Sequence, residues 1–244
     1  QILRTLEKNG AVEIFEREVF RLVRPAHAPK TSLPPPVLSD KQGEVYEELL
    51  KMQEAGQPSA ALLYGVTGSG KTLVYVSLIY KALEKGRGAI VLAPEIALTP
   101  QLLETFYGYF GNRVAILHSG LSAGERFDEW KRVKSGEAKV VVGTRSAVFA
   151  PLDNIGLIVI DEEQEHTYKS ESTPTYHARD VAKFRAVSHS ALLLLGSATP
   201  SVESMHAAKT GKYRLFELSE RYGDVPLPTV LFADMRDELM KGNG

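Results

Sequence analysis

The chain has 244 residues, 43% of them hydrophobic and 24% charged, and 29 basic against 30 acidic side chains give a formal net charge of −1. These are ordinary globular values, so contact with nucleic acid or an acidic membrane would need a local basic patch. The absence of cysteine excludes disulfides and thiolate chemistry, and the scattered histidines predict no zinc site. No apolar run reaches the ~18 residues of a membrane span and the start lacks signal-peptide character, so we expect a cytoplasmic protein without a membrane partner.

The first 37 residues predict the end of one domain followed by a linker. Within residues 1–24, Ile2–Lys8 is typical of a helix end, and Val12–Arg21 partly alternates as a strand or hairpin does. Residues 25–37 hold five of the 13 prolines. Because proline fixes φ and lacks a donor, we expect a stiff, extended linker there.

From residue 38 to 220, short apolar runs alternate with helical stretches, beginning with a capping box at Ser39–Gln42 that opens a helix to about Glu54. The runs are Ala60–Tyr64, Ala89–Ala93, Val114–Leu117, Val140–Val142, Leu157–Ile160, Leu192–Leu195 and Tyr213–Leu218. This pattern predicts an α/β fold, a mostly parallel sheet with helices on both faces.

Helix starts are marked by Thr99-Pro100 and Thr199-Pro200, by a second capping box at Ser122–Glu125, and by a helical pattern over residues 176–188. Residues 221–244 contain a further apolar run, Val230–Ala233, and predict the start of another unit. Polar or glycine-rich residues follow each of six apolar runs, which predicts one composite ligand site at the carboxyl edge of the sheet.

The segment GVTGSGKT matches the phosphate-binding loop (P-loop) pattern G-x-x-x-x-G-K-[ST] between a predicted strand and helix. Its backbone amides and the helix N-terminus would hold the phosphates of ATP, with Lys71 on the β/γ-phosphates and the Thr72 hydroxyl on Mg²⁺. The predicted nucleotide-binding residues are Gly65, Thr67, Gly68, Ser69, Gly70, Lys71 and Thr72.

Asp161 and Glu162 end an apolar strand, where two carboxylates are costly unless a cation meets them. Asp161 is predicted to hold Mg²⁺, and Glu162 to activate the attacking water. Ser197 and Thr199 follow the apolar run Leu192–Leu195 and could couple the acids to a moving element. Thr199 also suits a helix N-cap. Gln42 could contact adenine or simply complete its capping box.

Two segments suit a nucleic-acid strand. Thr144, Arg145 and Ser146 offer amide, hydroxyl and guanidinium groups to phosphates. Residues 165–179 interleave aromatics with cations, as base stacking plus phosphate contact requires; the candidates are Tyr168, Lys169, Tyr176 and Arg179. The alternative is an ordinary loop leading into the next helix.

Together these segments resemble the superfamily 2 helicase motifs: GVTGSGKT motif I, APEIALTPQ motif Ia, GTRSAVFAP motif Ib, DEEQ motif II and GSATPS motif III. The phrases LLYGVTGSGKT, LHSGLSAGER, VIDEEQE and YHARDVA are similar to those of the PriA family (primosomal protein N′), the bacterial replication-restart helicases. The resemblance covers most of residues 38–205.

The resemblance implies a RecA-like P-loop NTPase lobe, the first of two, preceded by the end of a winged-helix domain at residues 1–24. It implies ATP-dependent 3′–5′ translocation on single-stranded DNA, action at forked DNA in replication restart, and primosome proteins and single-stranded DNA-binding protein as partners. It also implies an adenine contact for Gln42 and DNA contacts for Pro94 and Glu95 in motif Ia.

One residue departs from the family pattern, which usually reads Asp-Glu-Glu-His, because Gln164 stands at the fourth position. Glutamine can hydrogen-bond much as neutral histidine does but cannot titrate. We therefore expect hydrolysis to survive, because Asp161 and Glu162 remain, and the departure bears on how tightly hydrolysis is coupled to DNA.

The leading hypothesis is a DNA-stimulated ATPase motor, whose first lobe alone would bind nucleotide but hydrolyse it weakly, because a second lobe supplies the other wall of the site. Two alternatives stay open: another DNA or RNA translocase of the same superfamily, and a nucleotide-gated binding module that does not translocate.

Overall fold

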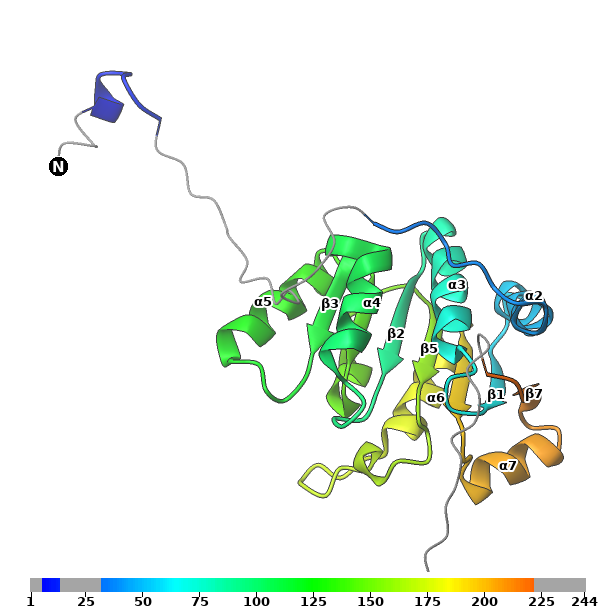
Figure 1. Ribbon diagram of the computed structural model, residues 1–244. Coiled ribbons are helices and arrows are strands. Elements are labelled where there is room, and N and C mark those ends of the chain that lie inside the picture. Colours follow the sequence, from blue (N-terminus) through cyan, green and yellow to red (C-terminus); the bar gives the residue numbers. More distant parts are fainter. Residues whose placement is uncertain (1–5, 14–31, 222–244) are drawn as a thin grey trace, which may run out of the picture.

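A computed structural model describes residues 6–13 and 32–221, and the latter range forms a seven-stranded sheet in the order β3-β4-β2-β5-β6-β1-β7 (Figure 1). All of the pairings between these strands are parallel, which confirms the predicted α/β class. The strands are β1 (Ser59–Gly65), β2 (Gly88–Leu92), β3 (Val114–Leu117), β4 (Val140–Gly143), β5 (Ile155–Ile160), β6 (Leu192–Ser197) and β7 (Arg214–Leu218).

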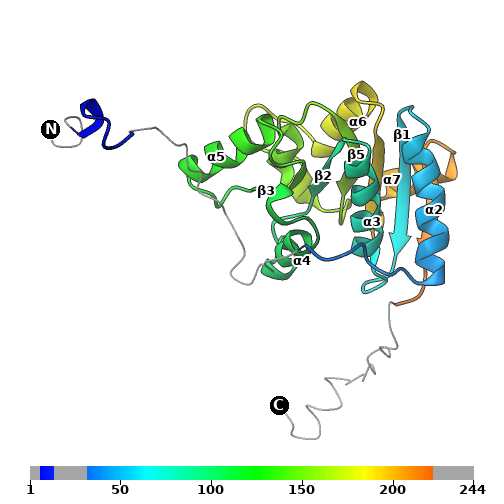
Figure 2. The same ribbon diagram turned by 90° about the horizontal axis from the view of Figure 1, so that it is seen from above.

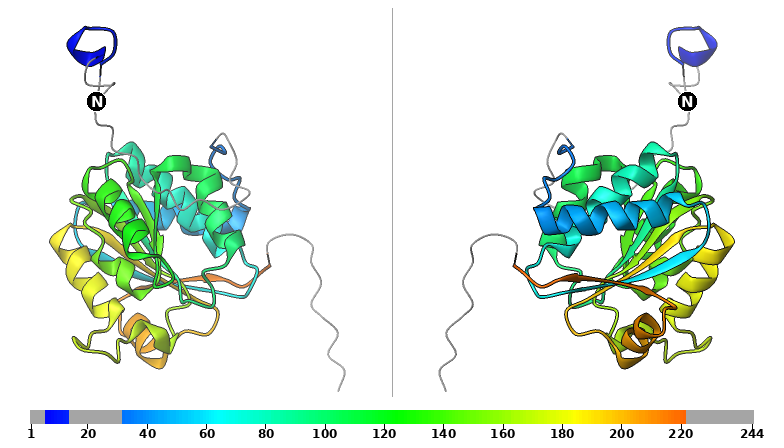
Figure 3. Two further views of the ribbon diagram at one scale, coloured as in Figure 1. Left: turned by 90° about the vertical axis from the view of Figure 1, so that its left-hand side faces the viewer. Right: turned by 90° about the vertical axis from the view of Figure 1, so that its right-hand side faces the viewer.

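Helices cover both faces of the sheet. They are α2 (Asp40–Glu54), α3 (Lys71–Glu84), α4 (Pro100–Phe110), α5 (Ala123–Lys134), α6 (Ala178–Ser188) and α7 (Val202–Lys209), with short 3₁₀ turns η1 (Gly111–Arg113), η2 (Arg145–Phe149) and η3 (His166–Tyr168). Alternate strand residues point to opposite faces: Leu63 packs in the core under α2, α3 and α4, and Leu62 in the core under α5, α6 and α7. Figures 2 and 3 show α2, α3 and α4 on one side of the strands and α6 and α7 on the other.

Three of the predicted helix starts are confirmed by their caps. Ser39 and Gln42 form a reciprocal capping box at α2, and Ser122 and Glu125 form another at α5. Thr99 accepts a hydrogen bond from the Leu102 amide at the start of α4, with a proline in the first turn. Each cap satisfies amides that the first helical turn leaves without partners.

The predicted start at Thr199-Pro200 is wrong. Helix α7 begins at Val202 and Ser201 is its N-cap, whose hydroxyl accepts from the Ser204 amide. The Thr199 amide instead donates to Ser197 Oγ (2.9 Å), which holds this residue to the strand end. Helix α6 likewise begins later than predicted, at Ala178, with His177 as its cap.

Strand β3 lies at one edge of the sheet, and helix α5 covers part of that edge with a buried ion pair. Arg132 donates to both carboxylate oxygens of Glu129 (2.9 and 3.1 Å) and to the Val114 carbonyl (3.3 Å). The Glu129 carboxylate in turn accepts from the Ile116 amide (3.0 Å). The two charges therefore supply partners for backbone groups that an edge strand would otherwise leave unpaired.

The flanking segments are described only in part. Residues 6–8 are helical and Gly10 follows at a φ of 69°, as expected of a helix end. Residues 32–39 run without helix or strand, anchored by the Tyr80 hydroxyl, which donates to the Leu33 carbonyl (2.6 Å). Most of the predicted strand at Val12–Arg21 and all of Val230–Ala233 lie outside the described residues. Across the described ranges no helix has the length and apolar character needed to cross a membrane.

Candidate functional site: a nucleotide cradle and an acidic strand end

The loop between β1 and α3 is built to hold an anion. Gly68 and Gly70 adopt φ values of 81° and 77°, in the left-handed region where side chains are strained. Gly70 is also the N-cap of α3, and no side chain caps that helix. The first backbone amides of α3 therefore have no capping side chain, and the positive N-terminal end of the helix lies at this loop.

Two side chains of this loop support the same conclusion. Lys71 is only 8% exposed, and its ammonium donates to the Gly65 carbonyl (2.7 Å) across the loop. The Ser69 hydroxyl is buried and lacks a hydrogen-bond partner among the described residues. A buried polar atom without a partner is rare in folded proteins. The residues present thus fit a triphosphate, which would supply acceptors for the hydroxyl, the ammonium and the amides.

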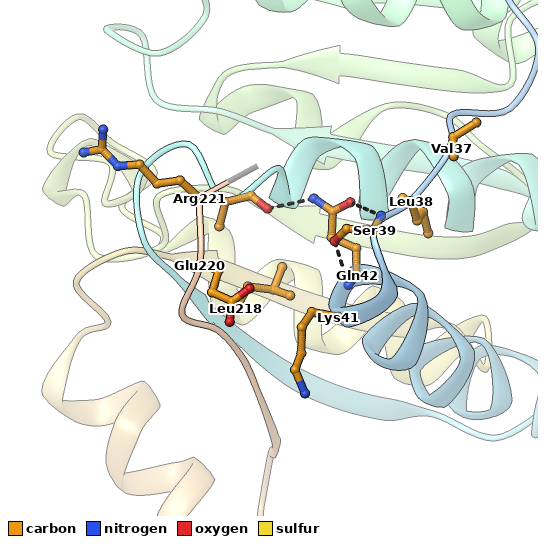
Figure 4. A pocket seen from close by; sticks show the side chains of 9 residues that line it. Val37, Leu38, Ser39, Lys41, Gln42, Leu218, Glu220 and Arg221 are labelled. Carbon is orange, nitrogen blue, oxygen red and sulfur yellow. Dashed lines mark hydrogen bonds between the residues drawn. The ribbon is translucent and has the colours of Figure 1, made fainter. Parts of the chain in front are cut away.

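Gln42 connects helix α2 to this loop. Its Nε2 donates to the Ser69 carbonyl (2.8 Å), and its Oε1 accepts from the Ser39 amide (2.9 Å) (Figure 4). It lines a pocket of about 450 Å³ with Val37, Leu38, Ser39, Lys41, Ser69, Leu218, Glu220 and Arg221. The capping role is therefore confirmed, while the adenine contact stays a prediction.

Asp161 follows β5 and faces the P-loop helix. The Tyr75 hydroxyl of α3 donates to its Oδ1 (2.9 Å). Burial, reinforced by the charge of Glu162, raises the pKa of Asp161 to about 6, while Tyr75 and the Lys71 charge act in the opposite direction. Such a carboxylate is costly to ionise without a cation nearby. The donor set thus fits Mg²⁺, which Asp161 and Thr72 would hold together with phosphate oxygens.

Glu162 is joined to the end of β6 by a chain of hydrogen bonds. Gln164 Nε2 donates to Glu162 Oε2 (3.0 Å), and the Ser197 hydroxyl donates to Gln164 Oε1 (2.6 Å). Ser197 Oγ also accepts from the Thr199 amide (2.9 Å). Glu162 adopts a φ of 45°, which is uncommon for a residue with a side chain and marks a constrained position. The four polar residues predicted here are therefore in one network.

Arg179, for which a DNA contact is predicted, forms an ion pair with the buried Glu163, and its DNA contact stays a prediction. Its guanidinium donates to Glu163 Oε2 (2.9 Å) and to the Ser201 and Ser204 hydroxyls (3.2 and 2.8 Å). The Glu163 side chain is completely buried and also accepts from the Ser201 amide (2.7 Å). This contact fixes α6 and α7 to the segment that carries Glu162.

Arg145, Lys169 and Glu95 line one hollow of about 490 Å³ with His166, Thr167, Glu171 and Ser172. Arg145 donates to the carbonyls of Thr167 (2.9 Å) and Lys169, so it ties its own segment to the loop that carries Lys169. Lys169, Glu95 and Ser146 are exposed. Glu95, Arg145 and Lys169, predicted strand-binding residues far apart in sequence, therefore line one hollow.

Three other predicted DNA contacts are buried. Tyr168 is 1% exposed, and its hydroxyl donates to the carbonyls of Leu92 (3.1 Å) and Asp161 (2.6 Å). Its predicted stacking on a base is therefore wrong, because its ring is core. Thr144 and Pro94 are buried as well, so the structure offers little of their side chains to a strand.

Two residues were missed by sequence reasoning. Phe149 is 54% exposed and packs edge-on against Tyr176 (4.9 Å between ring centroids), with the Arg145 guanidinium 5.9 Å from the Tyr176 ring. This makes Phe149 a candidate stacking group. Tyr75 was missed although its spacing of four residues from Lys71 places both on one helix face.

No cluster of three or more histidine, aspartate or glutamate side chains suitable for a metal occurs within the described ranges.

Residues 39–208 match the DEAD/DEAH box helicase family. The chain belongs to that family, and its parallel sheet and P-loop are consistent with this class of protein.

Within this class the chain is similar to replication restart protein PriA. It is 46% identical to the protein of Bacillus subtilis (strain 168) over 99% of this chain and 30% of that one. It is 45% identical to the protein of Synechocystis sp. over 99% of this chain and 29% of that one. The chain thus spans about 30% of the length of these relatives.

Two solved structures share the fold. RecG bound to a three-way DNA junction matches 78% of this chain and 25% of its own with a TM-score of 0.57 and 24% identity. The Pyrococcus furiosus Hef helicase domain matches 74% of this chain and 38% of its own, with a TM-score of 0.53 and 22% identity.

Proposed function

We propose that the chain is the first motor lobe of an ATP-dependent DNA helicase that acts in replication restart. The observation that carries the proposal is the joining of the P-loop helix to the acidic strand end, through Tyr75 and Asp161, in a chain similar to PriA over 99% of its length. Hydrolysis would drive 3′–5′ translocation on single-stranded DNA at forks. Primosome proteins and single-stranded DNA-binding protein would be partners, and the bacterial cytoplasm the site of action.

In this proposal the loop after Gly65 binds the phosphates of ATP through its amides and Lys71, while Gln42 contacts the adenine. Thr72 and Asp161 hold the magnesium ion that neutralises the phosphate oxygens when nucleotide is bound. Glu162 orients the attacking water and accepts its proton. Gln164 holds the Glu162 carboxylate in the orientation that this step requires.

The network from Glu162 to Thr199 is the proposed link between hydrolysis and DNA. The basic groups of the hollow, the partly exposed Arg145 and the exposed Lys169, would bind phosphates of the strand, with Phe149 and Tyr176 beside its bases. Because Arg145 bonds the carbonyls of the loop that directly follows the acidic segment, a strand that binds here can alter the position of Gln164.

Replacing Gln164 by alanine should uncouple ATP turnover from DNA binding in the complete protein. The Glu162 carboxylate loses the hydrogen bond from Gln164, and the Ser197 hydroxyl loses its acceptor. We expect turnover at saturating single-stranded DNA to fall about ten- to a hundredfold, with little change in nucleotide affinity. Phosphate release with and without DNA measures this. Gln164→His, which keeps one donor and one acceptor, is the matched variant and should retain most of the stimulation. Full stimulation in the alanine variant would show that the network does not couple.

The single lobe forms only one wall of the expected site, since motors of this kind add an arginine from a second lobe. We therefore expect this chain to bind ATP but to release phosphate slowly, with or without DNA. Nucleotide binding and phosphate release by the purified chain measure this. Rapid DNA-stimulated turnover by the chain alone would contradict the expectation.

ATP-driven displacement of a strand by the complete protein tests the proposed function. A duplex with a single-stranded tail of either polarity separates 3′–5′ movement from the opposite direction. ATP-dependent retention of DNA without displacement would favour a nucleotide-gated binding module, and stimulation by RNA alone would favour an RNA translocase.

A further inference from the structure

Tyr75 is a buried side chain whose hydroxyl points into the proposed nucleotide site. It lies four residues after Lys71 on α3, is 1% exposed, and donates a 2.9 Å hydrogen bond to Asp161 Oδ1. Burial raises the pKa of the Tyr75 phenol well above its ordinary value, so the group remains a donor. The P-loop helix and the acidic strand end are thereby joined by one hydrogen bond.

Gly196 provides a second, independent observation. It lies in β6, which pairs with β1 and β5, the strands that precede the P-loop and Asp161. A Cβ at this position would lie 1.8 Å from the Tyr75 hydroxyl oxygen and 3.1 Å from Asp161 Oδ1. A side chain at residue 196 is therefore incompatible with the hydroxyl in its observed place. Three elements, α3, β5 and β6, thus meet around this one hydrogen bond.

We propose that Tyr75 is a positioning residue for the proposed metal ligand Asp161. Gly196, which has no side chain, leaves the room that the Tyr75 hydroxyl needs. The inference rests on the proposed function. By holding one carboxylate oxygen, the phenol restricts rotation of the Asp161 side chain before nucleotide arrives. A fixed carboxylate binds a metal ion more tightly, because less orientation is lost on binding, and groups that orient metal ligands in this way contribute strongly to affinity.

The test is nucleotide binding by this chain as a function of Mg²⁺, followed with a fluorescent ATP analogue. Tyr75→Phe removes the hydroxyl and keeps the ring. In EDTA, the variant should bind the analogue within about twofold of the wild type, since the phosphate cradle is intact. The Mg²⁺ concentration that gives half of the metal-dependent tightening should rise about tenfold.

Tyr80→Phe is the matched control. It removes a hydroxyl from the same helix, but one that donates to the carbonyls of Leu33 and Tyr109 away from the cradle. It should leave the Mg²⁺ requirement unchanged.

Gly196→Ala should raise the Mg²⁺ requirement as Tyr75→Phe does, because its methyl group displaces the hydroxyl. In the double variant the two effects should not add, because each substitution alone already removes the same hydrogen bond to Asp161. Thermal unfolding of each variant checks that it is folded.

A wild-type Mg²⁺ requirement in Tyr75→Phe would overturn the inference, and so would an equal loss of affinity in EDTA, which indicates a purely structural role. Failure of the proposed function would give a different result. The nucleotide affinity of the wild-type chain would then be independent of Mg²⁺, and Lys71→Ala would not lower it.

Discussion

Alanine at position 71 is expected to abolish ATP turnover by the complete protein. The Lys71 ammonium is held inside the loop by the Gly65 carbonyl and lies close enough to lower the pKa of Asp161. There it can reach the β/γ-phosphates, whose charge grows in the transition state. Losing this charge should reduce turnover by about a hundredfold or more, measured as phosphate release with single-stranded DNA present.

Two further variants sharpen this experiment. Lys81→Ala removes a lysine from the same helix, but one paired with Glu84 (2.9 Å) at the exposed surface, and should leave turnover unchanged. Glu162→Gln should also abolish turnover yet preserve nucleotide binding, because it removes the proposed base and leaves the cradle. Near wild-type hydrolysis in Lys71→Ala or Glu162→Gln would refute the assigned roles.

Substitution of Arg132 by alanine should cause a large loss of stability. Arg132 is 1% exposed, and its removal breaks the buried ion pair with Glu129 and takes away the hydrogen bond to the Val114 carbonyl. Breaking a buried pair on one side costs about 3–5 kcal/mol. Chemical denaturation of the purified chain measures the change in the free energy of unfolding.

Lys134→Ala is the control, since Lys134 lies on the same helix but pairs with Asp153 (3.3 Å) in solvent. Its effect should stay within about 0.5 kcal/mol. If Arg132→Ala had an equally small effect, the ion pair between Arg132 and Glu129 would not stabilise the fold at the edge of β3.

The parts of the fold that follow from local rules were predictable. Each of the seven runs of residues expected as strands from 60 to 218 is a strand, because strands buried on both faces read as continuous apolar runs. The P-loop was predictable for the same kind of reason, since its glycines and Lys71 act within one short segment. Caps such as Ser39 depend on the next three residues only.

Errors arose where a distant residue decides the outcome. Thr199 and Pro200 match a helix start, but Glu163, 38 residues before Ser201, accepts from the Ser201 amide and the helix begins after it. Tyr168 looked like a surface aromatic because its neighbours are polar, yet its hydroxyl reaches the end of β2. Tyr75 gave no motif signal, since its role appears only when β5 and β6 place Asp161 and Gly196 around it.

The most direct measurement is a crystal structure of this chain with Mg²⁺ and a non-hydrolysable ATP analogue. We predict that the phosphates lie against the amides that follow Gly65, and that Thr72 and the Asp161 carboxylate hold the metal. A nucleotide bound elsewhere, or a metal that Asp161 does not approach, would contradict it.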